Sequence, residues 1–205
     1  MIALRHGLWI LLLILSAACG DSKPPPITLL HSDSIILSFG DSLTYGTGAA
    51  KTQSYPEELS RLLGGVRVIN AGVPGELSAQ GRARLPELLE QHQPQLVILC
   101  HGGNDLLRRQ DRNALQDNLR VMLQAIKQQG ADAILIGVPQ PSLTVSVPDF
   151  YEAIADEFNI PYLGEVLADV LGDENLKSDP IHPNAAGYRQ IAQTVADLIQ
   201  QAQRP

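Results

Sequence analysis

Two short segments of the chain carry the side chains that acyl transfer by a serine requires. Gly-Asp-Ser-Leu at residues 40–43 follows an apolar run, and a serine just past a strand end can project its hydroxyl into a crevice. Asp179 and His182 stand three residues apart on a segment stiffened by Pro180 and Pro183. A carboxylate there can accept the imidazole Nδ1–H, which leaves Nε2 to take the serine proton. Together the segments predict nucleophilic catalysis.

Glycines and an amide follow two further apolar runs. One run ends in Asn-Ala-Gly at residues 70–72, and the other precedes Gly-Gly-Asn-Asp at residues 102–105. Acyl transfer needs several N–H donors that converge on the tetrahedral oxyanion, and a glycine N–H admits the oxygen closely because no Cβ intervenes. Asn104 can supply a side-chain N–H, since the two glycines before it let the loop turn sharply.

The elements that must position these residues are strands and helices in alternation. Nearly all-apolar runs, typical of strands covered on both faces, lie at residues 35–39, 66–70, 96–100, 133–138 and 161–163. Helical spacing of apolar residues falls between or after them, at residues 54–63, 78–91, 112–129, 149–158 and 185–200. This pattern predicts one α/β domain with three αβα layers and a flavodoxin-like, doubly wound, five-stranded parallel sheet in the order 2-1-3-4-5. Ligands bind such sheets at the carboxyl ends of the strands, where the reactive segments fall.

In chain order, these segments resemble the four blocks of the SGNH (GDSL-type) hydrolase superfamily. The blocks are residues 40–43, Gly72, residues 102–105 and Asp179-x-x-His182, and the similarity extends from about Ile35 to Ile199. The chain looks most like the small bacterial arylesterase, lysophospholipase and thioesterase I-like branch of that superfamily.

The resemblance implies a role for each block. Ser42 would be the nucleophile, His182 the general base and acid, and Asp179 the carboxylate that orients the imidazole. The oxyanion hole would use the backbone N–H groups of Ser42 and Gly72 and the side-chain amide of Asn104. No cofactor is expected, and no pair of histidines has the spacing of metal ligands.

Other polar residues near these blocks are expected to support them. His101 directly precedes the glycine pair, and we expect it to pack or to assist indirectly, because no acidic residue stands at a spacing that would orient it. Cys100 ends a buried strand and is expected in the core. Asp41 and Asp105 are expected to hold their loops through hydrogen bonds to backbone amides.

Two loops are expected to shape an acyl pocket. The first spans residues 106–109 and begins with Leu106, and the second spans residues 139–148 and carries Leu143 and Val145 at alternating positions. These apolar side chains can line a wall for an acyl chain, and a loop that merely covers the sheet edge is an equally good interpretation.

The amino-acid composition argues against some classes of binding partner. With 22 acidic against 15 basic residues, the formal charge is -7, which argues against nucleic acid as a partner. Aromatic residues make up only 4%, too few for a base-stacking or carbohydrate-binding platform. We expect a monomer that acts on a small-molecule ester or lipid.

The N-terminus is typical of an export signal. Leu8 to Leu15 is an unbroken run of eight apolar residues after Arg5, well short of the ~20 that a membrane-spanning helix needs. Leu-Ser-Ala-Ala-Cys at residues 15–19 resembles a bacterial lipobox. We therefore expect residues 1–18 to be a lipoprotein signal peptide. Cys19 would be lipidated and would anchor the protein to a membrane of the cell envelope.

A spacer and a single domain are expected to follow the signal peptide. Residues 19–32 contain three consecutive prolines and read as a polyproline-type spacer, so the SGNH domain would span residues 33–205. The alternative is an ordinary secretory signal cleaved near Ala18, which would release a soluble periplasmic protein.

The sequence as a whole predicts a serine esterase that works through an acyl-enzyme. Two alternatives remain open. One is a carbohydrate or peptidoglycan O-acetylesterase with the same site, which would prefer acetate over octanoate esters. The other is a non-catalytic envelope module that uses the scaffold for binding. A broken triad would mark that module, and here every catalytic position is filled.

Overall fold

A computed structural model describes residues 23–140 and 145–203. Its centre is a five-stranded parallel sheet in the order β2-β1-β3-β4-β5, as predicted. The strands are β1 (Ile35–Gly40), β2 (Arg67–Gly72), β3 (Leu96–Cys100), β4 (Asp132–Ile136) and β5 (Tyr162–Leu163). The order reverses between β1 and β3, so the crevice for a ligand is expected at the carboxyl ends of these two strands.

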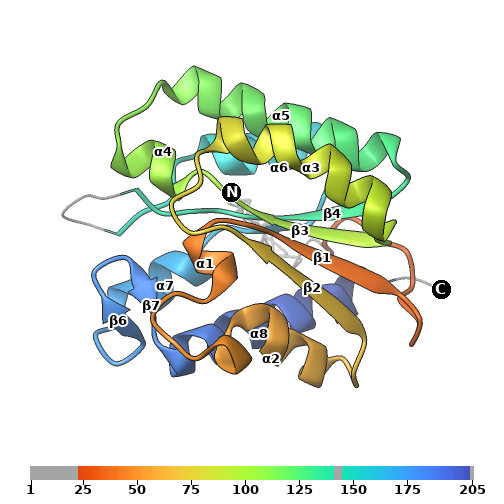
Figure 1. Ribbon diagram of the computed structural model, residues 1–205, viewed down its shortest axis with the longest axis horizontal. Coiled ribbons are helices and arrows are strands. Elements are labelled where there is room, and N and C mark those ends of the chain that lie inside the picture. The colour runs from red at the N-terminus through yellow and green to blue at the C-terminus, as the bar shows by residue number, and fades with distance from the viewer. Residues whose placement is uncertain (1–22, 141–144, 204–205) are drawn as a thin grey trace, which may run out of the picture.

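Helices cover both faces of the sheet and complete three layers (Figure 1). One layer contains α3 (Ser78–His92), α5 (Arg112–Gln128) and α6 (Phe150–Phe158). The other contains α2 (Tyr55–Leu62), α7 (Val166–Gly172) and α8 (Ala185–Ala202). The three-layer αβα prediction is confirmed, because α3 packs against α5 on one face and α2 against α8 on the other.

Several short elements beside the site were not expected. They are α1 (Ser42–Tyr45), η1 (Lys51–Gln53), α4 (Gly103–Leu107) and the hairpin of β6 (Lys177–Asp179) with β7 (His182–Pro183). None is long enough to show a hydrophobic period, so their sequences read as loops.

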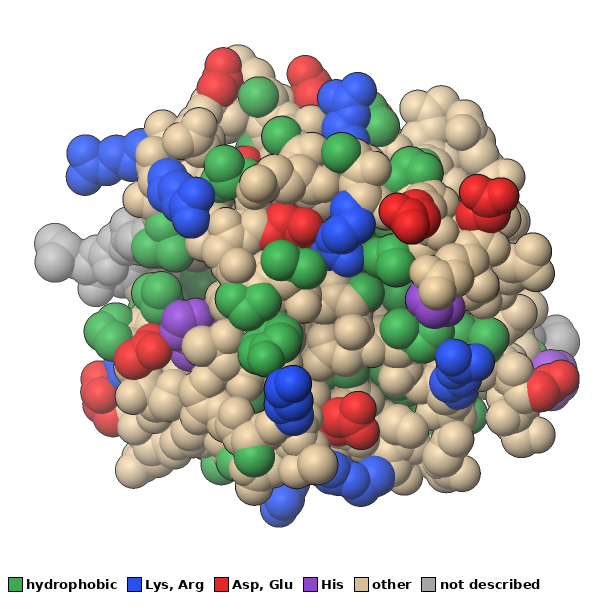
Figure 2. Space-filling model, in the orientation of Figure 1, with side chains coloured by type: hydrophobic (Ala, Val, Ile, Leu, Met, Phe, Trp, Pro, Cys, Tyr) green, Lys and Arg blue, Asp and Glu red, His purple; other side chains and the backbone are tan. Residues whose placement is uncertain are grey.

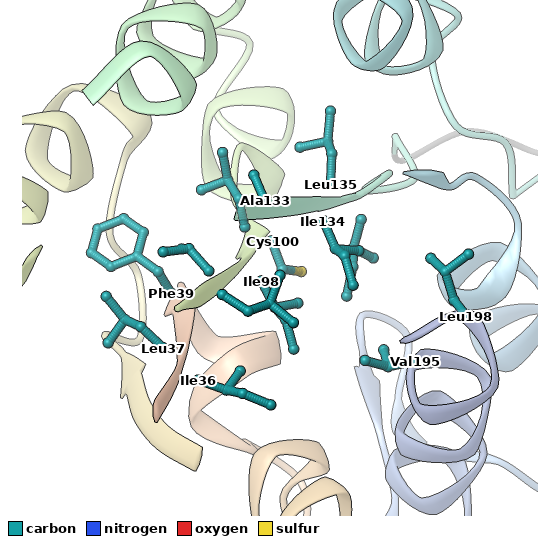
Figure 3. Close-up of a cluster of buried hydrophobic side chains, with 14 of the residues drawn as sticks. Ile36, Leu37, Phe39, Ile98, Cys100, Ala133, Ile134, Leu135, Val195 and Leu198 are labelled. Atoms are coloured by element: carbon teal, nitrogen blue, oxygen red, sulfur yellow. The ribbon is translucent and has the colours of Figure 1, made fainter. Parts of the chain in front are cut away.

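The core forms because β1 and β3 are apolar on both faces. Every residue of β3 is buried, as are all residues of β1 after Ile35. Figure 3 shows Ile36 and Ile98 on the side of the sheet that faces α8, toward Val195, while Phe39 points to the opposite layer. Burial on both faces fixes the two strands whose ends carry the reactive segments.

The boundary predicted between spacer and domain is wrong. Ile27 is 4% exposed and belongs to the hydrophobic core. Its N–H donates to the Ala202 carbonyl at 3.1 Å, and the N–H of Thr28 donates to Asp132 Oδ2 at 2.6 Å. The folded domain therefore begins before residue 33, because an apolar side chain after the proline run finds a place against the core.

The predicted signal peptide and Cys19 lie outside the described residues. Within the described ranges, no helix has the length and apolar character needed to cross a membrane.

Candidate active site

Ser42 sits where β1 ends and α1 begins. Gly40 leaves no room for a side chain, because the Cys100 carbonyl of β3 lies against it. Asp41 then caps α1 by accepting the N–H of Leu43 at 3.0 Å. This tight strand-to-helix turn places the half-buried Ser42 in the wall of a cavity at the carboxyl edge of the sheet.

His182 and Asp179 come from the β6–β7 hairpin and face each other across its two strands. His182 Nδ1 lies 2.8 Å from Asp179 Oδ2, and His182 Nε2 lies 3.0 Å from Ser42 Oγ. Asp179 Oδ1 accepts the N–H groups of Ile181 and His182 at 2.9 Å each. The structure thus brings together the three residues that sequence reasoning singled out, in the order that proton transfer requires.

The charge of Asp179 is stabilised by these donors. Burial by itself raises the pKa of this carboxyl, but the hydrogen bonds from the His182 ring and from the N–H of Ile181 outweigh it. The net effect holds the pKa of Asp179 below its ordinary value, so the group is ionised at neutral pH and can orient the imidazole.

The hairpin is flanked by contacts from the start of α8 and from the segment after α1. Asn184 caps α8 and also donates through Nδ2 to the Asn175 carbonyl at 2.8 Å. Tyr188 of α8 donates its hydroxyl to the Thr47 carbonyl, after α1, at 2.7 Å. Gly48 follows at φ +97 and packs directly on Ser178 of β6. These contacts fix the distance between His182 and Ser42.

Asn104 approaches the serine from the end of β3. Its side-chain Nδ2 donates to the Glu76 carbonyl at 3.1 Å and to Asp41 Oδ2 at 3.2 Å. Asp41 and Asn104 both line the cavity with Ser42. Burial raises the pKa of Asp41, and the hydrogen bond from Leu43 only partly offsets it.

Gly72 does not occupy the position expected for an oxyanion donor. Its N–H donates to the side-chain Oδ1 of Asn70 at 3.0 Å, and Tyr45 packs against its Cα. Gly75, three residues later, lines the cavity with Ser42 and Asn104. The loop after β2 continues past Gly72 before it reaches the cavity, so Gly75 and not Gly72 lies in the cavity wall.

The cavity has a volume of about 440 Å³ and a mainly apolar wall. Leu107, Val138, Val145, Leu171 and Ile181 contribute to it. Figure 2 shows hydrophobic side chains gathered at the left of the face, where Figure 1 places α4, β6 and β7.

The three predicted pocket residues have different outcomes. Val145 lies in the cavity wall. Leu106 is 9% exposed and packs into the core instead, because α4 turns it inward and presents Leu107 to the cavity. Leu143 lies outside the described residues.

His101 is fully buried and does not contact Ser42. Its Nε2 lies 3.1 Å from Glu76 Oε2, so an acidic partner does orient it, contrary to the sequence argument. That partner comes from another loop, which spacing along the chain cannot show. Cys100 is buried in the core, and Asp105 accepts the Ser78 N–H at 2.8 Å, as expected for both.

No cluster of three or more His, Cys, Asp or Glu side chains that could hold a metal ion occurs among the residues that the structure describes.

Comparison with known proteins assigns the chain to a family. A model of the GDSL-like lipase/acylhydrolase family matches residues 38–190. The chain belongs to this family. The match runs from β1 into α8 and therefore includes every block of the site.

Several relatives of this GDSL-like hydrolase are named as esterases or thioesterases. Thioesterase 1/protease 1/lysophospholipase L1 of Escherichia coli strain K12 is 33% identical over 172 residues, covering 80% of this chain and 83% of the relative. Esterase TesA of Pseudomonas aeruginosa is 32% identical over 172 residues, covering 78% and 85%. Arylesterase of Vibrio mimicus is 31% identical over 174 residues, covering 80% and 87%.

Solved structures agree with this assignment. A crystal structure of the esterase EstA from Pseudoalteromonas sp. has a TM-score of 0.74 at 25% identity, covering 82% of this chain and 98% of that chain. A crystal structure of TesA also has a TM-score of 0.74, at 30% identity and 82% and 99% coverage. The SGNH resemblance is confirmed, and the chain is an esterase-type hydrolase of this family.

Sequence reasoning missed three residues beside the site of this GDSL-like hydrolase. Gly75 follows Pro74, and a Pro-Gly pair marks a turn that could have suggested it. Glu76 and Arg84 pair across the start of α3, but a charged pair at that spacing carries no signal of its own.

Proposed function

We propose that this GDSL-like hydrolase cleaves carboxylic esters through a covalent acyl-enzyme on Ser42. The observation that carries the proposal is the pair of contacts made by His182, with Ser42 Oγ at 3.0 Å and with Asp179 Oδ2 at 2.8 Å. Hydrogen-bond reach from nucleophile to base and from base to carboxylate is the geometry that activates a serine.

Acylation begins when Ser42 Oγ attacks the ester carbonyl carbon. His182 Nε2 takes the hydroxyl proton, and Asp179 stabilises the imidazolium that results. The tetrahedral intermediate collapses when the bond from carbon to the alcohol oxygen breaks. The leaving alcohol takes the proton from His182, and the acyl group remains on Ser42.

Deacylation repeats these steps with water. His182 removes a proton from a water molecule, whose oxygen attacks the acyl carbon. Collapse of the second intermediate returns the proton to Ser42 and releases the carboxylic acid.

Three donors around the cavity stabilise the oxyanion in this proposal. They are the backbone N–H of Ser42, the backbone N–H of Gly75 and the Nδ2–H of Asn104, with Gly75 in the place first given to Gly72. The support is that Ser42, Gly75 and Asn104 line one cavity. Of the two hydrogens on Asn104, the one shared with Asp41 is available to the substrate, because Asp41 lines the cavity and the second acceptor, the Glu76 carbonyl, does not belong to the cavity wall.

The acyl chain lies along the apolar wall formed by Leu107, Val145 and Ile181. These side chains line the cavity and are 41%, 42% and 40% exposed, so a bound chain would cover them. Each CH₂ removed from water contributes about 0.8 kcal/mol, which favours esters longer than acetate.

The enzyme acts in the cell envelope, anchored through Cys19. This part of the proposal rests on the N-terminal sequence, with its short apolar run and lipobox-like residues 15–19. Because every residue of the proposed site comes from one chain, a monomer suffices for activity.

The test compares wild type with Ser42→Ala on nitrophenyl esters from acetate to dodecanoate. We expect Ser42→Ala to lower kcat by about 10⁴- to 10⁶-fold, since the nucleophile is gone. We also expect it to abolish labelling by a fluorophosphonate. Ser32→Ala, at an exposed serine outside the cavity, is the matched control and should behave as wild type.

In wild type, kcat/KM should rise with chain length beyond acetate. Turnover by Ser42→Ala above a tenth of wild type would overturn the nucleophile assignment. A maximum at acetate would instead favour the O-acetylesterase.

A further inference from the structure

A buried ionic cluster lies behind Asn104, formed by Arg84, Glu76 and His101. The Arg84 guanidinium donates two hydrogen bonds to the Glu76 carboxylate, at 2.9 Å to Oε1 and 2.7 Å to Oε2. His101 Nε2 reaches the same Oε2 at 3.1 Å. The His101 side chain is fully buried and that of Glu76 is 6% exposed, whereas the Arg84 side chain is 25% exposed. Burying charges costs free energy and is weak evidence for stability alone, so a functional reason is worth seeking.

The protonation of the cluster follows from its hydrogen bonds. The N–H of Gly102 donates to His101 Nδ1 at 3.0 Å, so Nδ1 carries no hydrogen. Nε2 therefore carries a ring hydrogen and donates it to Glu76 Oε2. Burial tends to raise the pKa of Glu76, but the hydrogen bonds from His101 and Arg84 lower it to about 2. The cluster is thus an Arg–Glu ion pair with a hydrogen bond from a buried histidine.

The cluster joins the two loops that carry oxyanion donors. Glu76 follows Gly75 in the loop after β2, while His101 and Gly102 lead into Asn104 after β3. The backbone carbonyl of Glu76 accepts one Nδ2 hydrogen of Asn104 at 3.1 Å. The side chain of Glu76 is therefore clamped while its carbonyl orients the Asn104 amide, which leaves the other hydrogen on the cavity side.

Packing leaves the cluster little freedom to move. The Arg84 guanidinium lies over the Phe39 ring at 4.3 Å from its centroid, and the His101 ring lies 5.9 Å from the same ring. Gly81 of α3 has no space for a side chain because the His101 ring lies against it. Arg84 also donates to the Ala71 carbonyl at 3.0 Å, which ties α3 to the end of β2.

We propose that Arg84, Glu76 and His101 are positioning residues that hold the Asn104 amide ready for the oxyanion. This inference rests on the proposed function, in which Asn104 is an oxyanion donor. A donor that is fixed before reaction stabilises the transition state more than the bound ester, so loosening it lowers kcat with little change in KM.

The test is a double-mutant cycle between Glu76→Gln and Asn104→Ala in the full chain, with kcat and KM measured on one nitrophenyl ester. Glu76→Gln keeps the shape of the side chain and removes its charge. We expect it to lower kcat by about 10- to 100-fold, with KM within about twofold of wild type. Once Asn104 is alanine, adding Glu76→Gln should cost less than about threefold, because nothing remains to be oriented.

Further variants at His101 and Arg84 keep the proposal testable if Glu76→Gln fails to fold. His101→Leu removes both ring hydrogen bonds and should show the same dependence on Asn104. Arg84→Lys keeps the positive charge but loses the bidentate contact with Glu76. Its kcat should fall less than that of Arg84→Met. The matched control is Glu157→Gln, because Glu157 pairs with Arg120 at 2.7 Å on the surface between α5 and α6.

The outcomes separate the two proposals. If Asn104→Ala is impaired while Glu76→Gln and His101→Leu keep kcat within about twofold, the positioning role is overturned and the oxyanion role survives. Losses that multiply fully in the double variants also overturn it, since they show an effect independent of Asn104. If Asn104→Ala itself keeps wild-type kcat, the oxyanion assignment fails.

Discussion

At the scale of single residues, the site depends on carboxyl groups whose neighbours give them different properties. Asp41 and Glu76 are both buried, and burial raises the pKa of each. Glu76 receives Arg84 and His101 as donors, which lowers its pKa to about 2. No cation contacts Asp41 closely enough to form an ion pair in the described structure, and its pKa is raised. A carboxyl group thus forms an ion pair at Glu76, whereas at Asp41 it caps a helix and has a raised pKa.

The Glu76 cluster predicts how stability depends on pH. Because the pKa of Glu76 falls from 4.5 to about 2 on folding, its contribution is complete above pH 4.5 and is lost as pH falls through 2. Urea unfolding of wild type and Glu76→Gln should therefore show a gap in free energy of unfolding that is largest near neutral pH and shrinks in acid.

Glu157→Gln serves as the control for this measurement. Its ion pair with Arg120 is exposed and should contribute little at any pH. A wild-type to Glu76→Gln gap that stays constant down to pH 2 would contradict the prediction.

At the scale of elements, the β6–β7 hairpin decides whether His182 meets Ser42. The strands are too short to be stable alone, so the hairpin depends on what packs against it. Gly48 provides that contact at φ +97, and a Cβ there would meet Ser178 and the Pro183 carbonyl. Ser178 lies in β6 and Pro183 in β7. A side chain at position 48 would therefore push the hairpin, and His182 with it, away from Ser42.

We therefore predict that Gly48→Ala lowers kcat by about 10- to 100-fold, since a displacement of about 1 Å in a catalytic group costs this much. Steady-state kinetics on a nitrophenyl ester would measure the change. Gly64→Ala is the matched control, because Gly64 also has a positive φ, +69, but nothing lies within 4 Å of a Cβ there. It should lose some stability and keep kcat. Equal kcat in the two variants would argue that the hairpin is not held through Gly48.

At the scale of the whole molecule, the N-terminal segment and the active site lie at opposite ends of the sheet. Thr28 bonds to Asp132, the first residue of β4, whereas Ser42 and Asn104 follow the last residues of β1 and β3. Parallel strands all point the same way, so these ends are separated by the length of the strands. The chain therefore enters the domain at the end of the sheet opposite to the cavity. A lipid anchor at Cys19 would attach the protein to the membrane from that end.

Ile27 should therefore contribute to stability and not to catalysis. Replacing this buried side chain by alanine is expected to lower the free energy of unfolding by about 2–4 kcal/mol through lost burial and a cavity. Denaturant unfolding would measure the loss, while kcat should stay within about twofold of wild type. Leu29→Ala is the control, because Leu29 is 43% exposed and should change neither quantity. A large fall in kcat for Ile27→Ala would show that the two ends of the sheet are coupled.

The sequence by itself determined the sheet order, the three layers and four residues of the site. Ser42, Asn104 and His182 line one cavity, and Asp179 bonds to His182 behind it. This was possible because buried parallel strands leave continuous apolar runs, and because parallel strands deliver whatever follows them to one edge.

Only the tertiary structure decided which glycine reaches the cavity, which leucine of α4 lines it and which carboxylate orients His101. It also decided that Ile27 belongs to the core. Each of these depends on contacts between residues far apart in the chain, such as Glu76 with His101 and Ile27 with Ala202. Spacing along a sequence records the local period of an element, and it carries no measure of which loops meet once the elements pack.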